Sequence, residues 1–404
     1  MRTFCFLFMP ATMFLVGVLP SPLLAQSTDN ESRQAIVEQA QTTKSTMLAP
    51  YVPSTFERMV TRAENILLNG PTKWHPFFEN SYSGGGFAPG VGYVQRVSPY
   101  STVDVRGSFS IKQYKLAEAE FMSPHLFHRR GELSVVGGWK DTTQVAFYGI
   151  GSNNSKSDRT DFAFEMPYGG AQLKLKPTRR LLTLAGGADV ARWSFKSPSG
   201  TAPSVNSVYT PATLTGVGIP TTFVHSHASV GFDWRPAPGY ARRGGFYGLT
   251  GHDYWDRDSH LGFRRVDYEA SQHFPILRDS WVVSVRGLAS TTFSKEGQQI
   301  PFYLLPSLGG GSSLRGYSSW RFRDRDSLLL QGEWRIMVNR FFDTAVFYDT
   351  GKVATRVADL DFNRMKHDYG FGARFHTPFA TVLRIEVARS NEGTALVFAS
   401  SPIF

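Results

Sequence analysis

The sequence predicts an all-β fold, a transmembrane antiparallel β-barrel preceded by a short N-terminal helical segment. Three observations lead to this prediction. Segments of about ten residues alternate between apolar and polar side chains along most of the chain, as the strands of membrane barrels do. Past residue 25, no apolar run reaches the length of a membrane-spanning helix. The chain also opens with an export signal and ends in Phe404.

Residues 1–25 are predicted to be a secretory signal peptide. Arg2 precedes an apolar stretch over residues 4–19, and the small residue Ala25 marks the predicted cleavage point. A single membrane anchor is the alternative, but the apolar run is short for a span and no positive cluster follows it. Cys5 is the only cysteine of the 404 residues, so the mature chain is predicted to have neither a disulfide nor a catalytic thiol.

Residues 26–79 are predicted to be a short periplasmic segment with one amphipathic helix. A capping box that runs from Ser54 to Glu57 opens this helix, and Gly70-Pro71 ends it. The apolar side chains between these signals fall at helical spacing: Phe56, Met59, Val60, Ala63, Ile66 and Leu67. Packing against the base of the barrel is the favoured position of the helix, and a plug within the lumen is the alternative.

The composition suits a membrane barrel and gives no support to an enzyme. Aromatic residues make up 14% of the chain and there are 38 glycines, as expected for aromatic girdles and tight turns. The net charge of +10 favours a cationic lumen or anionic headgroups, so outer-membrane lipid is a predicted partner and nucleic acid is not. The sequence contains no phosphate-binding loop, no nucleophile elbow and no catalytic triad. No catalytic residue and no cofactor are therefore predicted.

Strand-like segments repeat at intervals of roughly twenty residues from residue 80 to the end, which predicts a barrel domain over 80–404. Apolar side chains occupy alternate positions in 328–339 and 383–387, with polar residues such as Arg384 and Glu386 between them. A soluble sandwich also alternates. The export signal, the lack of cysteine in the mature chain and the terminal aromatic residue favour the membrane barrel.

Fifteen segments fit the strand pattern: 86–97, 101–121, 129–149, 159–176, 180–195, 221–236, 243–256, 260–275, 279–294, 301–307, 326–339, 343–354, 366–377, 380–390 and 394–404. Single-chain bacterial barrels have an even number of strands. One strand is therefore expected to be hidden, either in 196–220 or within a segment counted once.

Two motifs near the C-terminus resemble a known family signature. Residues 310–317 read Gly-Gly-Ser-Ser-Leu-Arg-Gly-Tyr, and residues 347–351 read Phe-Tyr-Asp-Thr-Gly. Together with Gly-Glu-Trp at 332–334, they resemble the BamA/TamA/FhaC superfamily of outer-membrane barrels, the bacterial surface antigens. The resemblance covers roughly 80–404. It implies sixteen strands, the outer membrane of a Gram-negative bacterium and a role in protein insertion or translocation, in a variant without periplasmic POTRA domains.

The same resemblance implies a loop that folds back into the lumen and is held there by acidic residues of the barrel wall. The predicted loop lock has three loop residues and three strand residues: Arg315, Gly316, Tyr317, Glu333, Asp349 and Gly351. Glu333 lies on the polar face of its strand, and a guanidinium can engage two carboxylates at once. Three unrelated surface charges are the alternative.

The last strand ends in a pattern that resembles the signal by which the barrel assembly machinery recognises its substrates. Its residues are Leu396, Phe398 and Phe404, while Ser400 and Pro402 depart from the apolar pattern. The protein is therefore predicted to be a client of that machinery, and unfolded proteins are its candidate substrates. A passive outer-membrane channel or a structural barrel is the alternative function.

His225 and His227 place two imidazoles on one face of a strand, which is a pattern that can bind a metal ion. Without a cysteine or carboxylate nearby, pore-lining or surface histidines are the favoured interpretation. The sequence therefore predicts no metal site.

Overall fold

The computed structural model describes residues 35–43, 73–178, 181–258, 260–277, 280–399 and 401–404. Residues 35–43 form an exposed helix in a first unit that ends at Ala63. The predicted signal peptide and the predicted helix between Ser54 and Gly70 lie outside the described residues. None of the described helices is long and apolar enough to cross a membrane.

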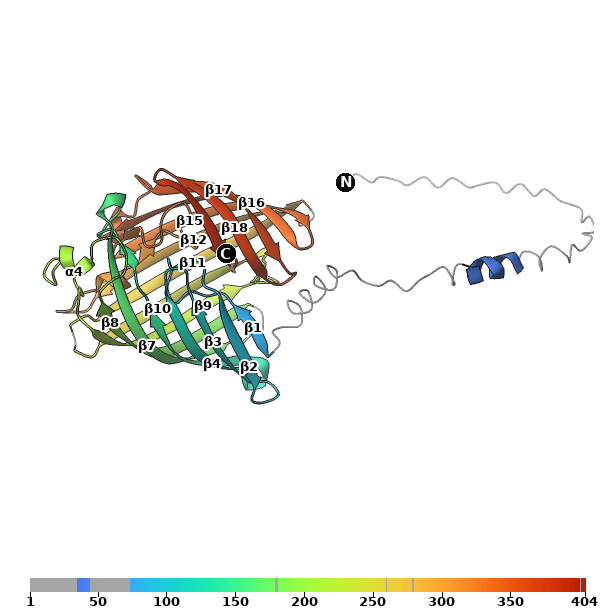
Figure 1. The fold of residues 1–404 in the computed structure, drawn as a ribbon, viewed down its shortest axis with the longest axis horizontal. Helices are drawn as coiled ribbons and strands as arrows, with labels where there is room; N and C mark the ends of the chain where they lie inside the picture. Colours follow the sequence, from blue (N-terminus) through green and yellow to red (C-terminus); the bar gives the residue numbers. More distant parts are fainter. Residues whose placement is uncertain (1–34, 44–72, 179–180, 259, 278–279, 400) are drawn as a thin grey trace, which may run out of the picture. The chain divides into compact units, whose positions relative to one another are not determined.

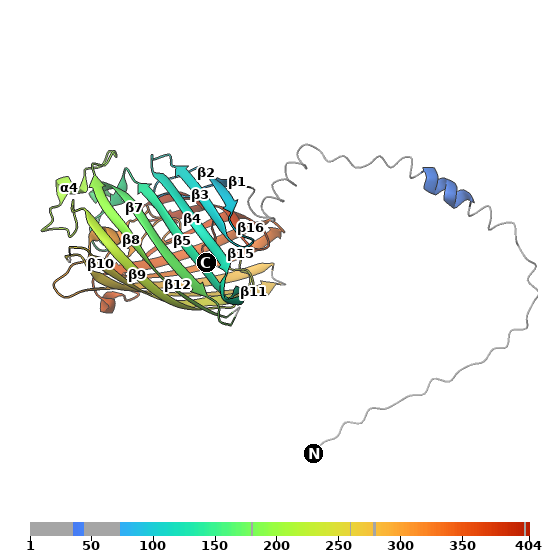
Figure 2. The same ribbon diagram turned by 90° about the horizontal axis from the view of Figure 1, so that it is seen from below.

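The second unit, Glu64–Phe404, is built on one antiparallel sheet of 17 strands that curls around a lumen (Figures 1 and 2). Its strands are β1 (Trp74–Phe77), β2 (Gly90–Arg96), β3 (Thr102–Phe109), β4 (Lys115–His125), β5 (Gly131–Asp141), β6 (Val145–Phe147), β7 (Thr160–Leu175), β8 (Leu182–Lys196), β9 (Thr221–Asp233), β10 (Gly244–Asp256), β11 (Phe263–Leu277), β12 (Trp281–Ser294), β15 (Asp326–Asn339), β16 (Phe342–Ala354), β17 (Lys366–His376), β18 (Thr381–Ser390) and β19 (Gly393–Ala399). The predicted all-β, antiparallel barrel fold is confirmed.

Strands that follow one another in the chain are neighbours in the sheet. The meander passes from β5 directly to β7 and from β12 directly to β15. The three-residue β6 pairs with β7 alone, and β13 (Ser307–Leu308) pairs with β14 (Phe322–Arg323) in a separate two-stranded sheet. Without β6, the described part of the chain therefore forms a meander of sixteen strands, which is the predicted number.

Alternation along the strands separates an apolar outer surface from a polar lumen. On β15 and β16, Trp334, Val346 and Tyr348 are exposed on the outer surface, whereas Glu333 and Asp349 are buried on the inner side. Successive side chains of a strand point to opposite faces, so every second residue of a strand faces the lumen, and these residues are the polar ones. The strand order therefore decides which polar groups meet inside.

The two ends of the barrel differ. Most connections at one end, which we call the turn end, are short, although that between β9 and β10 has ten residues (234–243). The opposite loop end carries the long connections, which contain η1 (Lys156–Asp158), α4 (Val205–Val208), η2 (Phe302–Leu304), the β13–β14 pair and η3 (Val357–Asp359). The short helix α3 (Leu126–Arg129) belongs to the turn end.

Three of the strand predictions need correction. The segment 101–121 contains two strands, β3 and β4, because alternation continues on both sides of a tight turn in which Gln113 has a φ of 64°. The segment 301–307 is not a barrel strand, since its apolar Phe302 and Tyr303 are buried within the loop end instead of lying on the outer surface of the sheet. The sheet also begins earlier than residue 80, with β1.

The predicted final strand over 394–404 is also too long, because β19 ends at Ala399. Residues 401–404 turn into the lumen, where the carbonyl oxygens of Ser401 and Ile403 accept hydrogen bonds from Arg384 and Arg286, both at 2.7 Å. Proline has no backbone N–H to donate to a sheet ladder, so Pro402 cannot extend the strand pairing.

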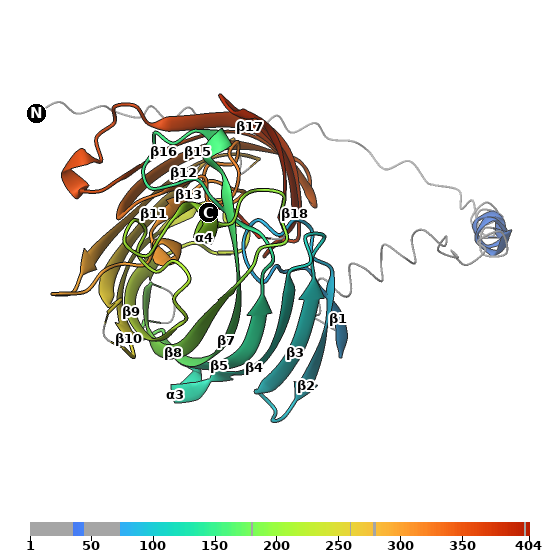
Figure 3. The ribbon, with the colours of Figure 1, turned by 60° about the vertical axis from the view of Figure 1, so that its left-hand side comes forward.

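The first and last strands do not close the sheet. Among the described residues, β19 pairs only with β18, and β1 pairs only with β2 (Figure 3). We call this boundary the seam. Unpaired backbone groups at a sheet edge can template the pairing of another strand.

Candidate functional site

The candidate site is built by the long connection between β12 and β15, which folds inward from the loop end. Gly309 and Gly310 have φ values of 115° and 96°, a region that residues with a side chain rarely adopt. A Cβ on Gly309 would lie 2.3 Å from the carbonyl oxygen of Ser318. Leu314 and Tyr317 are buried in a hydrophobic cluster with residues of β13 to β16. Residues 309–321, which we call the inner loop, therefore form an ordered and self-packed unit.

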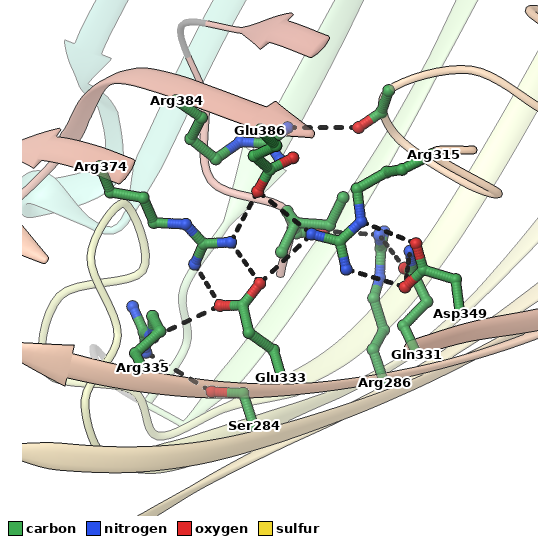
Figure 4. A network of polar contacts seen from close by, with 12 residues as sticks. Ser284, Arg286, Arg315, Gln331, Glu333, Arg335, Asp349, Arg374, Arg384 and Glu386 are labelled. Carbon is green, nitrogen blue, oxygen red and sulfur yellow. Dashed lines mark hydrogen bonds and ion pairs between the residues drawn. The ribbon is translucent and has the colours of Figure 1, made fainter. Parts of the chain in front are cut away.

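Arg315 lies at the tip of the inner loop and is fully buried (Figure 4). Its Nε and Nη2 donate to the two carboxylate oxygens of Asp349 at 2.7 and 2.8 Å, a bidentate pair. Its Nη1 donates to Glu386 at 3.1 Å and to Glu333 at 3.4 Å. The guanidinium carbon also lies 3.4 Å from the centre of the Phe347 ring. One side chain is thus joined to three strands, β15, β16 and β18.

Further arginines of the barrel wall complete the network. Arg374 on β17 pairs with both carboxylate oxygens of Glu333 and donates to Glu386 at 2.9 Å. Arg384 donates to the other oxygen of Glu386 at 2.7 Å. Removing ions from water is costly, and their attraction offsets this cost only where every charge has a partner. Glu333 and Glu386 meet this condition, because each is paired with arginines of the wall and with Arg315 of the inner loop (Figure 4).

The backbone of the inner loop lies very close to the barrel wall, and glycines make this close approach possible. The carbonyl oxygen of Gly316 accepts a hydrogen bond from Ser390 at 2.8 Å, and a Cβ on Gly316 would lie 2.6 Å from the Cβ of Asp368. Gly351 has a similar role on β16, because a Cβ there would lie 2.8 Å from Leu308. Both contacts leave room for hydrogen atoms only.

Tyr317 is held by polar contacts at the end of the inner loop. Its hydroxyl donates to Asn391 at 2.7 Å and lies 3.3 Å from the carbonyl oxygen of His367. Burial, together with the nearby carboxylates of Glu392 and Asp368, raises the pKa of Tyr317 to about 12. The hydroxyl therefore remains a donor at neutral pH.

Residues 239–394 match the model of the Omp85 superfamily domain. These residues are an Omp85 superfamily domain. This stretch includes the inner loop and β10 to β18, so every charged residue of the network lies within the matched part. The predicted superfamily relationship is confirmed.

Solved structures of Omp85 proteins share the fold. BamA from Haemophilus ducreyi lacking POTRA domains 1–3 gives a TM-score of 0.56 at 15% identity, over 80% of this chain and 68% of that one. CdiB from Escherichia coli gives 0.51 at 12% identity, and CdiB from Acinetobacter baumannii gives 0.50 at 10%. The matches cover 81% and 82% of this chain but 59% and 60% of the two CdiB chains. No curated protein matches the sequence.

The structure brings the six predicted lock residues to one region of the lumen, with Arg315 in contact with Asp349 and Glu333. Sequence reasoning missed Glu386, Arg374 and Arg384. Alternation had placed Arg384 and Glu386 on a polar face, so the signal was available. Alternation within one strand could not predict that the inner loop lies opposite β18.

The other predicted residues lie apart from this network. Leu396 and Phe398 are exposed on the outer surface of β19, with 59% and 57% of their surface accessible. Phe404 is buried on the inner side, near His273 of β11. The predicted C-terminal stripe is therefore divided between the two faces, because the chain turns inward after Ala399.

The reasoning against a metal site at His225 and His227 rested on a wrong premise, namely that no carboxylate is near. The carboxylate of Asp189 lies 2.7 Å from Nδ1 of His225. These residues are 36 positions apart in the chain and become neighbours only through the pairing of β8 with β9.

We expect Gly316→Ala to destabilise the barrel by about 1–3 kcal/mol, because the added methyl group overlaps Asp368 and the loop must shift away from the wall. Urea unfolding in detergent, followed by tryptophan fluorescence, measures this change. Gly251→Ala is the matched control, since a Cβ at Gly251 meets no atom within 4 Å. Equal stability of the two variants would show that the inner loop does not need this close approach.

Proposed function

We propose that this Omp85 barrel inserts or translocates polypeptides at the outer membrane, and that the inner loop must be held by Arg315 for this activity. The fully buried guanidinium, bound to Asp349, Glu333 and Glu386 near the middle of their strands, is the observation that carries the proposal. Fixing a loop at this depth costs the desolvation of several charges. That cost is difficult to explain for a barrel that only has to remain open.

The orientation follows from the two ends of the barrel. Outer-membrane barrels have short periplasmic turns and longer extracellular loops. The turn end would then face the periplasm of a Gram-negative bacterium, and the inner loop would enter the lumen from the cell exterior. Lipid would contact the exposed apolar side chains of the outer surface, such as Tyr247, Tyr268 and Val285.

The seam offers a mechanism for insertion. A client strand can pair with a sheet edge through its backbone, whatever its side chains. The inward turn of residues 401–404 leaves β19 at seven residues, and β1 has only four. An unfolded outer-membrane protein could therefore add its strands at this boundary, where few hydrogen bonds have to be broken first.

A second inward segment closes the turn end. Residues 234–243, which we call the strap, reach from β9 and β10 across to β16, β17 and β18. The ring of Tyr240 stacks on His376 with ring centres 3.7 Å apart, and its hydroxyl donates to Asp343 at 2.6 Å. The carbonyl oxygen of Gly239 accepts from the backbone N–H of Thr381 at 2.8 Å. The lumen is thus crossed at two levels.

The alternative, a passive channel, is favoured by the space that remains inside. One cavity of about 740 Å³ has Arg265, Glu269 and Arg286 in its lining, and another of about 1320 Å³ has Lys174 and Lys176. Strands β8 to β11 contribute to both linings, together with β7 and the strap in the larger cavity, and no charged residue of the Arg315 network lines either one. A solute path along this side of the lumen would require the strap to move.

Two measurements on the refolded barrel separate these functions. We would follow the insertion of an unfolded outer-membrane protein into vesicles that contain the barrel, and record single-channel conductance in planar bilayers. Loss of client insertion in Arg315→Ala supports the proposal. Large, stable pores in the parent protein, with no acceleration of client folding, would contradict it and favour the channel.

Substitutions at the C-terminal residues can distinguish an effect on assembly from an effect on the stability of the folded barrel. We propose that Leu396, Phe398 and Phe404 are recognised by the barrel assembly machinery while the chain is unfolded. We expect Phe404→Ala to cost about 3–5 kcal/mol of unfolding free energy because Phe404 is buried, whereas Phe398→Ala removes a lipid-facing side chain without leaving a cavity in the lumen. Urea unfolding measures the first effect, and the yield of folded barrel in cells measures recognition. Equal stability of both variants would contradict the inward position of Phe404.

A further inference from the structure

The inner wall formed by β8 to β11 carries imidazoles and carboxylates that the proposed function does not use. His225 and His227 lie on β9, and His252 lies on β10. Asp189 on β8 and Asp267 on β11 flank them. The residues next to these in the chain include Val190, Val224 and Tyr268, which are exposed on the outer surface, so the cluster faces the lumen.

Three of these residues converge. Asp189, His225 and His227 each present one potential ligand atom, and these atoms lie within 4.8 Å of one another. The register explains this, because Asp189 is directly opposite His225 and Gly187 is opposite His227. Nδ1 of His227 is buried and has no hydrogen-bond partner among the residues that the structure describes. A buried nitrogen without a partner is unusual in a native structure.

His252 extends the cluster on the next strand. Its Nδ1 lies 2.9 Å from Nε2 of His225, and its Nε2 lies 3.1 Å from a carboxylate oxygen of Asp267. Asp267 is held in turn by Arg265 at 3.1 Å and by Ser290. Histidines that bind metals usually donate their second ring N–H to a carboxylate, which fixes the tautomer and the ring orientation. Asp267 occupies this position for His252.

We infer that Asp189, His225 and His227 bind a divalent transition-metal ion of the zinc class, with His252 as the fourth ligand. Imidazole nitrogen with one carboxylate suits Zn²⁺, whereas Ca²⁺ and Mg²⁺ prefer sets of oxygen ligands. Zinc lies about 2.1 Å from such ligands, so a tetrahedral ion needs its ligand atoms about 3.4 Å apart. The ligand atoms of Asp189, His225 and His227 lie within 4.8 Å of one another, so binding requires them to move together by up to about 1.4 Å. The His227 ring lies close against Gly187, where a Cβ would come 2.9 Å from its Cε1.

The ion reaches this site from the lumen. Asp267, together with Arg265 and Ser290, lines the cavity of about 740 Å³. Bound metal would join β8, β9 and β10, on a part of the wall separate from the Arg315 network on β15 to β18. The inference does not depend on polypeptide insertion, because metal binding is measured on the isolated protein.

Equilibrium dialysis of the untagged, refolded full-length barrel against ZnCl₂, followed by metal analysis, tests this inference. We expect one Zn²⁺ per barrel in the parent protein and at least a tenfold loss of affinity in the double variant His225→Gln/His227→Gln. The matched control His260→Gln/His367→Gln also removes two imidazoles, both exposed, and should bind like the parent. Asp189→Asn, which keeps the shape of the side chain, should also weaken binding.

Cobalt provides a second measurement on the parent protein. Co²⁺ should give the strong visible absorption of a tetrahedral site, and Zn²⁺ should remove it. No saturable Zn²⁺ binding by the parent overturns the inference, whatever the variants do. Equal binding by the parent and His225→Gln/His227→Gln would place the ion elsewhere and overturn it as well.

Discussion

Arg315→Ala is expected to lower the unfolding free energy of the barrel by about 3–5 kcal/mol, the usual cost of removing one partner of a buried ion pair. The cost falls mainly on Asp349. Glu333 and Glu386 keep Arg374 as a partner, whereas Asp349 has no other ion pair among the described residues and keeps neutral donors such as the amide of Gln331 at 3.2 Å. Urea unfolding in detergent measures the loss, and the vesicle assay should show that client insertion is lost with it.

Two further variants distinguish stability from function. Arg315→Ala/Asp349→Ala removes both charges of the bidentate pair and should recover part of the lost stability, because Asp349 is no longer left as a buried carboxylate without its cation. It should not recover client insertion, since the inner loop is still released. Arg315→Lys keeps the charge but loses the planar fork of donors, and should have intermediate stability. Arg389→Ala, at an exposed arginine of β18, is the control. Recovery of insertion in the double variant would show that Arg315 acts only through stability.

The sequence was sufficient to predict the fold and the central ion pair. Alternation has a period of two, so it indicates which face of the sheet a residue lies on. The order of two short motifs resembled one superfamily closely enough to place Arg315 opposite Asp349. Alternation does not report which residues meet across a lumen. Glu386 was on the correct face from the start, but only the path of the inner loop brings it to 3.1 Å from Arg315.

The same limit explains the other differences. The strap connects β9 with β10, and its sequence shows turn residues such as Pro236 and Gly239 without showing that Tyr240 reaches β16 and β17. The turn of Phe404 into the lumen depends on carbonyl groups that meet Arg286 and Arg384, two arginines from different parts of the wall. Each contact joins segments that are far apart in the chain, and the local periodicity of a sequence does not predict such contacts.

The largest change in conductance is expected when both inward segments are released in one protein, in Arg315→Ala/Tyr240→Ala. We expect the inner loop near mid-depth and the strap at the turn end to obstruct the lumen in series, so that an ion has to pass both. Constrictions in series limit the current together, and opening one leaves the other in place. Tyr240→Ala removes the stacking on His376 and the hydrogen bond to Asp343, so the strap loses its anchor on β16 and β17.

We therefore expect each single variant to raise single-channel conductance modestly and the double variant to raise it by more than the sum of the two increases. Planar-bilayer recording measures this, with Arg315→Ala/Tyr247→Ala as the control because Tyr247 of β10 is exposed on the outer surface. Simple addition of the two increases would mean that ions pass the inner loop and the strap by separate paths. A parent conductance already as large as that of the double variant would mean that neither segment blocks the lumen, and the passive channel would then be the better description of this barrel.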